Sequence, residues 1–131
     1  MRIRLEPWIS CSILSFFLCV TSVNAFAGTC DMSLFSIDEA RTNLRRAANE
    51  TNFEAAKDYA RHARRSLEDA AMSAMVCGCD VAYMEFDTAG THARRAGDAY
   101  SPQEVVDSLN RAIRAFNSAL EALRTSATPR R

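Results

Sequence analysis

Net charge is absent from this sequence of 131 residues, in which 16 lysine and arginine side chains balance 16 aspartate and glutamate side chains. The basic residues are almost all arginine, and Lys57 is the only lysine. A domain that binds nucleic acid or an anionic membrane concentrates an excess of basic charge on one surface. We therefore expect neither nucleic acid nor a membrane surface as a partner.

The motifs of common catalytic sites are absent as well. The sequence has no Gly-rich phosphate loop, no Gly-x-Ser-x-Gly, no His-Glu-x-x-His and no haem-attaching Cys-x-x-Cys-His. His62 and His92 each begin a His-Ala-Arg-Arg tetrapeptide, and neither has a metal-binding side chain four residues later. Asp80, Glu85 and Asp87 fall on different faces of one predicted helix. We expect surface imidazoles, solvated carboxylates, no enzyme activity and no cofactor.

The first 27 residues have the pattern of a secretory signal peptide. Arg2 and Arg4 give a basic start, residues 8–23 form an uncharged apolar run, and the small residues at 25–27 stand at the cleavage spacing. The run is shorter than the roughly 20 residues that a membrane-spanning helix needs. We expect cleavage before Gly28 and export to the periplasm or the extracellular space.

Export determines how the cysteines are expected to behave. Cleavage leaves Cys30, Cys77 and Cys79 in the mature chain. Neither Cys19 nor Cys30 follows the aliphatic and small residues of a lipidation site, so we expect no lipid anchor. Thiols in an oxidising compartment tend to form disulfides.

The mature chain begins with a stretch that has no periodicity, and we predict an extended leader over residues 28–35. A Ser-x-x-Glu capping box at 36–39 then predicts a helix that runs to about residue 49. A Thr-x-x-Glu box at 51–54 predicts the start of the next helix.

The second predicted helix has the most regular pattern and ends at Gly78, because glycine is typical of a C-terminal cap. Its apolar stripe is dominated by alanine: Phe53, Ala56, Ala60, Ala63, Leu67, Ala70, Ala74 and Cys77. Small residues along a stripe let a partner helix approach closely, so we expect a tightly packed neighbour there.

The third predicted helix starts at Cys79 or Asp80 and stops near Asp98. Its stripe comprises Ala82, Phe86, Ala89, Ala93, Ala96 and Tyr100. Gly90 and Gly97 weaken it, because a glycine inside a helix costs about 1 kcal/mol relative to alanine.

The fourth predicted helix has the clearest start: a Ser101 cap, Pro102 at the first helical position and Glu104 at the third. Its stripe is the bulkiest, with Val105, Leu109, Ala112, Phe116, Ala119 and Leu123 widened by Val106, Ile113 and Leu120. We expect this helix to fill the middle of the core. Residues 127–131 are predicted to be a frayed basic tail.

Four amphipathic helices with short connections predict an all-α fold: an up-down-up-down antiparallel four-helix bundle over residues 36–126, built as two helical hairpins. Arg-Arg-Ala-Ala-Asn at 45–49 and Arg-Arg-Ala-Gly-Asp at 94–98 each precede a capping box. Duplication of one hairpin or shared composition would both explain this similarity.

This topology brings three cysteines within reach of one another. The first helix starts roughly 15–20 Å short of Gly78 along the bundle, and an extended chain from Cys30 to residue 36 spans about 20 Å. Cys30 can therefore reach Cys77 or Cys79, and a disulfide there would contribute about 2–4 kcal/mol. The remaining cysteine is a free thiol, an intermolecular bridge or, with the other two, a ligand of Cu(I) or Zn(II).

The sequence predicts a small exported, non-catalytic helical bundle, stapled by a disulfide, that associates with an unknown protein or serves as an envelope accessory factor. The Ala-rich second helix or an exposed part of the third would make the contact, and a disulfide-linked or helix-packed homodimer is a further option. The alternative is a soft-metal or thiol redox protein that uses Cys30, Cys77 and Cys79; a strained Cys-Gly-Cys disulfide would be readily reduced.

Overall fold

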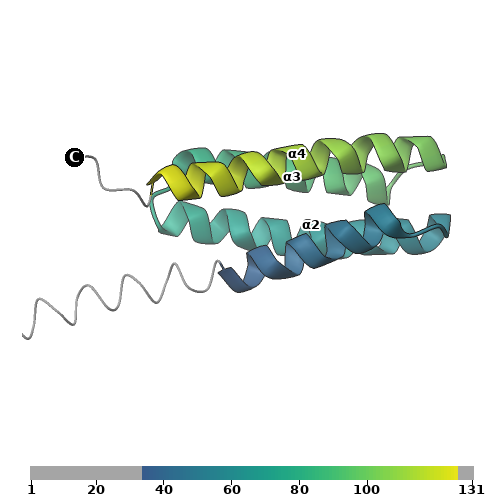
Figure 1. Ribbon diagram of the computed structural model, residues 1–131, viewed down its shortest axis with the longest axis horizontal. Coiled ribbons are helices and arrows are strands. Elements are labelled where there is room, and N and C mark those ends of the chain that lie inside the picture. Colours follow the sequence, from purple (N-terminus) through teal and green to yellow (C-terminus); the bar gives the residue numbers. More distant parts are fainter. Residues whose placement is uncertain (1–33, 127–131) are drawn as a thin grey trace, which may run out of the picture.

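The computed structural model describes residues 34–126, and this part of the chain is all-helical, with four helices packed against one another and no strand (Figure 1). The first helix covers residues 34–49 and is called the 34–49 helix below. It is followed by α2 (Phe53–Val76), α3 (Asp80–Gly97) and α4 (Pro102–Ser126). The predicted four-helix fold is confirmed. The predicted signal peptide, most of the predicted leader and the predicted tail lie outside the described residues.

The first two predicted helix starts are corrected by the structure. Residues 34 and 35 are already helical, so the 34–49 helix does not begin at the predicted box of 36–39, and the leader is not extended up to residue 35. The N-cap of α2 is Asn52 rather than Thr51, because the Asn52 Oδ1 accepts a hydrogen bond from the Ala55 N–H at 3.0 Å. Glu50 supports this cap by accepting the Asn52 N–H, also at 3.0 Å.

The start of α4 matches the prediction. The Ser101 hydroxyl accepts the Glu104 N–H at 3.2 Å, and Pro102 is the first helical residue. The Glu104 carboxylate accepts a hydrogen bond from the Tyr100 N–H at 2.8 Å. In an ordinary capping box it would accept from the N–H of the cap residue itself, which here is Ser101. Two of the backbone donors at this corner are thereby satisfied.

Alanine makes up most of the core. The predicted stripe of α2 is confirmed from Ala56 to Ala74, and that of α3 from Ala82 to Ala96. Every stripe residue between these bounds is buried. Tyr100 does not continue the stripe and is 95% exposed, because α3 ends at Gly97 and the helical periodicity ends with it. Val106 is likewise exposed.

We expected α4 to fill the middle of the core, and six of its residues are buried there, but it does not do so alone. The largest fully buried side chains are Phe86 of α3 and Leu67 of α2. Phe116 of α4 joins them, with its ring centroid 6.1 Å from that of Phe86. The helix α3 packs along both α2 and α4, whereas α2 and α4 meet at few positions. The core is therefore shared among the helices, with α3 in contact with both α2 and α4.

The helix α3 runs through both of its glycines, and α2 approaches one of them too closely for a side chain. A Cβ atom at Gly90 would lie 3.8 Å from the Leu67 Cβ, an ordinary contact. A Cβ atom at Gly97 would lie 2.8 Å from the Arg61 Cγ, closer than real Cβ atoms come. The absence of a side chain at Gly97 lets the Arg61 Nη2 donate to the Gly97 carbonyl at 2.8 Å. This hydrogen bond places the start of α2 beside the end of α3.

Candidate functional site at the Cys77–Cys79 corner

Gly78 shapes the corner between α2 and α3, as predicted. It has a φ of 77°, in the left-handed region that favours glycine. Its N–H donates to the Met75 carbonyl at 3.0 Å, and the Cys79 N–H donates to the Ala74 carbonyl at 2.9 Å. This pair of hydrogen bonds is the Schellman motif, which satisfies carbonyls that the end of a helix leaves unpaired.

The two cysteines of the corner differ in state. Cys79 is the N-cap of α3 without a side-chain capping bond, and its thiol is free and half-buried. Its Sγ lies 3.5 Å from the Ser126 Oγ, which places the start of α3 beside the end of α4. Cys77 is half-buried and is not a free thiol. Because Cys79 is free, the two cysteines are not joined to each other. Cys30 lies outside the described residues.

Large apolar side chains surround this corner and face outward. They lie on the last turns of α2 and the first turns of α3, and each is between 46% and 65% exposed. We call this set the methionine corner: Met72, Met75, Val76, Val81 and Met84. It contrasts with the interior of the same helices, where alanine dominates. Monomeric proteins leave few contiguous apolar patches exposed unless they bind something there.

The methionine corner was not among the predicted site residues. Its signal in the sequence is a second apolar row, since Met72, Met75 and Val76 recur at three- and four-residue steps away from the alanine stripe. Val81 and Met84 repeat this spacing after the corner. The Ala-rich helix α2 was one of the two predicted contact surfaces; its alanine stripe is buried inside the bundle, whereas its residues Met72, Met75 and Val76 are exposed. The exposed part of α3 is accessible.

Metal ligands of the common types do not converge within residues 34–126. No group of three or more His, Cys, Asp or Glu side chains there is placed to hold an ion. Asp80 and Asp87 are exposed and Glu85 is partly exposed. This absence concerns neither a site that includes Cys30 nor a site built from the sulfur atoms of methionine.

The two histidines also differ. His62 is exposed, as predicted. His92 is half-buried, and its Nδ1 is buried without a hydrogen-bond partner among the described residues, so the predicted surface position is wrong for this side chain. Burial lowers the pKa of His92, and the positive charges of Arg95, Arg111 and Arg114 lower it further. Arg111 and Arg114 belong to α4, so part of the positive charge that acts on His92 comes from a neighbouring helix.

Comparison with known proteins gives no matching family model, no matching curated protein and no matching solved structure. Among the described helices, none is both long enough and apolar enough to cross a membrane. The case for a function therefore depends on the corner and its surroundings.

The lowered pKa of His92 predicts a pH-dependent stability. The folded protein favours the neutral imidazole, so the unfolded chain binds more protons as the pH falls below about 6.5, and the free energy of unfolding decreases toward pH 5. His92→Gln should reduce this decrease, as measured by urea unfolding at pH 8 and at pH 5.5. His62→Gln, at an exposed position, is the control and should retain it. An unchanged decrease in His92→Gln would contradict the assignment.

Proposed function

We propose that this protein is a small exported helical bundle without a catalytic role that acts by binding another protein through the methionine corner. The exposure of Met72, Met75 and Met84 together with Val76 and Val81 carries the proposal. Methionine side chains are flexible and polarisable, and such surfaces adapt to an apolar partner. A protein that remained monomeric and unbound would gain nothing from these exposed side chains, because their transfer out of water is favourable.

We further propose that the four helices follow one another in up-down-up-down antiparallel order. The Arg61–Gly97 and Cys79–Ser126 contacts support this order, since each joins the start of one helix to the end of the next. The connections of a few residues between consecutive helices support it as well. In this order the Cys77–Cys79 corner and the end of α4 share one end of the bundle.

The disulfide staple of the proposal joins Cys30 to Cys77. Cys79 is a free thiol and Cys77 is not, so Cys77 is the cysteine of this corner that we assign to the disulfide with the leader. Secretion by a signal peptide over residues 1–27 would supply the oxidising compartment in which this bond persists. The staple would hold the leader beside the methionine corner.

A soft-metal site is the second candidate, and the thioethers of the corner favour it. Met72, Met75 and Met84 lie on the two helical turns that flank the free thiol of Cys79. Thioether and thiolate sulfur atoms are the ligands that Cu(I) prefers. Stoichiometric Cu(I) binding that depends on the Cys79 thiol would distinguish this function from protein association.

The staple predicts one reactive thiol in the mature protein without reductant, at Cys79. Cys30→Ser should lower the free energy of unfolding by about 2–4 kcal/mol, because it releases a constraint on the unfolded chain. Cys79→Ser should leave the stability within about 0.5 kcal/mol of the parent, since its thiol forms no disulfide and a serine hydroxyl can keep the contact with Ser126. Thiol counting and urea unfolding measure both. Three reactive thiols, or equal stability in the two variants, would contradict the staple.

Protein association predicts position-dependent photocrosslinking in cells that produce the exported protein. A photoreactive phenylalanine analogue in place of Met84 should form a covalent adduct with a different protein. The same analogue in place of Arg65, an exposed residue of α2 outside the methionine corner, is the control and should form none. An adduct only with a second copy of this chain, or equal adducts at both positions, would overturn the proposed association.

A further inference from the structure

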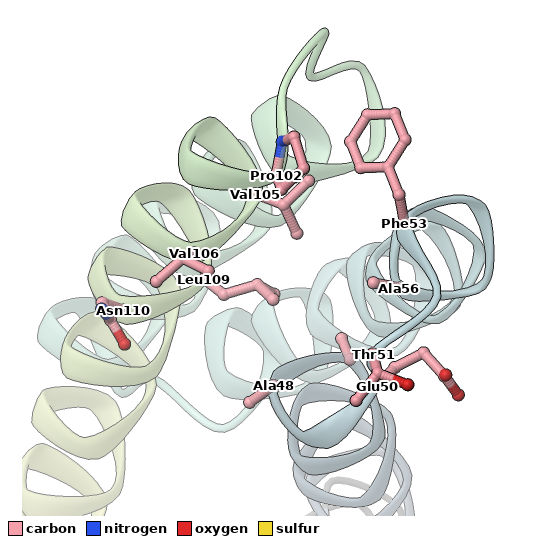
Figure 2. A pocket seen from close by; sticks show the side chains of 11 residues that line it. Ala48, Glu50, Thr51, Phe53, Ala56, Pro102, Val105, Val106, Leu109 and Asn110 are labelled. Atoms are coloured by element: carbon pink, nitrogen blue, oxygen red, sulfur yellow. The ribbon is translucent and has the colours of Figure 1, made fainter.

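Two cavities lie between the 34–49 helix and α4, away from the cysteine corner. One has a volume of about 130 Å³ and is lined by Val105 and Leu109 of α4. The other has a volume of about 270 Å³ and is lined by Ile113 and Phe116. Ala48 lines both, so the two cavities meet at this residue, and together they are called the groove below. Figure 2 shows the smaller cavity, with Ala48 on one side and Leu109 on the other.

The groove stays open because its two walls are unequal. At the smaller cavity the wall from the 34–49 helix is made by alanine at positions 47 and 48, whereas α4 contributes larger apolar side chains. At the larger cavity the same helix contributes Leu44 and two arginines beside Ala48. An alanine side chain is too short to fill the space opposite a valine or leucine. The result is an apolar channel rather than a packed contact.

One end of the groove is cationic. Arg41 and Arg45 both line the larger cavity. The guanidinium of Arg41 is already engaged, with Asp38 at 3.0 Å and with the face of the Phe116 ring at 5.9 Å from its centroid. Arg45 is exposed and forms no ion pair within residues 34–126. An unpaired guanidinium beside an apolar channel complements a ligand with an acidic head and a hydrocarbon tail.

The other end offers no comparable cation. Glu50 lines the smaller cavity, and one of its carboxylate oxygens accepts the Asn52 N–H, so the charge at this end is negative. Phe53 and Pro102 close this end with apolar surface. The polarity of the groove therefore runs in one direction, from a charged end at Arg45 to an apolar end at Pro102.

We propose that the groove binds a free fatty acid, with its carboxylate on the Arg45 guanidinium and its chain running past Ala48 toward Val105. From residue 117 to residue 106 the groove follows α4 for about 16 Å, which suits a chain of medium length. This site is independent of the association proposed for the methionine corner, and its failure would leave that proposal standing.

Dodecanoate is the probe, titrated into the purified mature protein below its micelle concentration and followed by calorimetry. It should bind with one site per chain. Butanoate, which has the head without the chain, should not bind measurably. Dodecan-1-ol, which has the chain without the charge, should bind roughly tenfold more weakly, because a charge-assisted hydrogen bond is lost.

Two variants assign the binding to the groove. Arg45→Gln should weaken dodecanoate binding roughly tenfold and leave dodecan-1-ol binding unchanged. Ala48→Phe, at an exposed position where the cavities meet, should abolish binding of both. Arg65→Gln, an exposed charge that lines neither cavity, is the control and should change nothing. Thermal unfolding confirms that each variant is folded.

Absence of dodecanoate binding to the parent protein would overturn the proposal. So would binding that survives Ala48→Phe, because the ligand would then lie elsewhere. Equal affinity for dodecanoate and dodecan-1-ol, together with an unaffected Arg45→Gln variant, would show an apolar cavity without a carboxylate site and would also overturn it.

Discussion

Close contact between helices through alanine and glycine is the constraint on which the rest of this structure depends. Ala60, Ala63 and Ala70 of α2 are completely buried, and Gly90 and Gly97 of α3 lie against the same helix. Small side chains bury little apolar area each, so cohesion comes from many short-range contacts between closely spaced backbones. Only a few large side chains, chiefly Phe86, Leu67 and Phe116, fill the centre.

This way of packing accounts for the surfaces that remain. The large apolar side chains near the Gly78 corner lie outside the alanine seam of the same helices and are exposed. On the other side of the molecule, alanine at positions 47 and 48 faces larger side chains of α4 and leaves a channel. The methionine corner thus presents large apolar side chains to solvent, whereas the channel lies beside small ones.

Much of the fold could be predicted from local pattern. The helix end at Gly78 and the cap at Ser101 are properties of a few adjacent residues, and both were predicted correctly from the sequence. The start of α2 was not, because Thr51 and Asn52 are adjacent and both can cap a helix, so only the geometry selects Asn52. Tyr100 was misplaced because periodicity alone does not show that α3 has ended.

The candidate sites were harder to predict, because they depend on which helices are neighbours. The pattern of buried positions points into the bundle, and it says nothing of the exposed row that contains Met75 and Met84. The channel beside Ala48 depends on how the 34–49 helix lies against α4, which no periodicity encodes. His92 is one residue before a core alanine and was expected at the surface, yet its Nδ1 is buried.

Replacement of one seam alanine by a larger residue tests the packing most directly. Ala60→Leu places three further carbon atoms in a site that is fully buried, and it should lower the free energy of unfolding in urea by about 1–3 kcal/mol. Ala55→Leu makes the same change at a partly exposed position of the same helix and should change it by less than about 0.5 kcal/mol. Equal stability of the two variants would contradict a seam that requires small side chains.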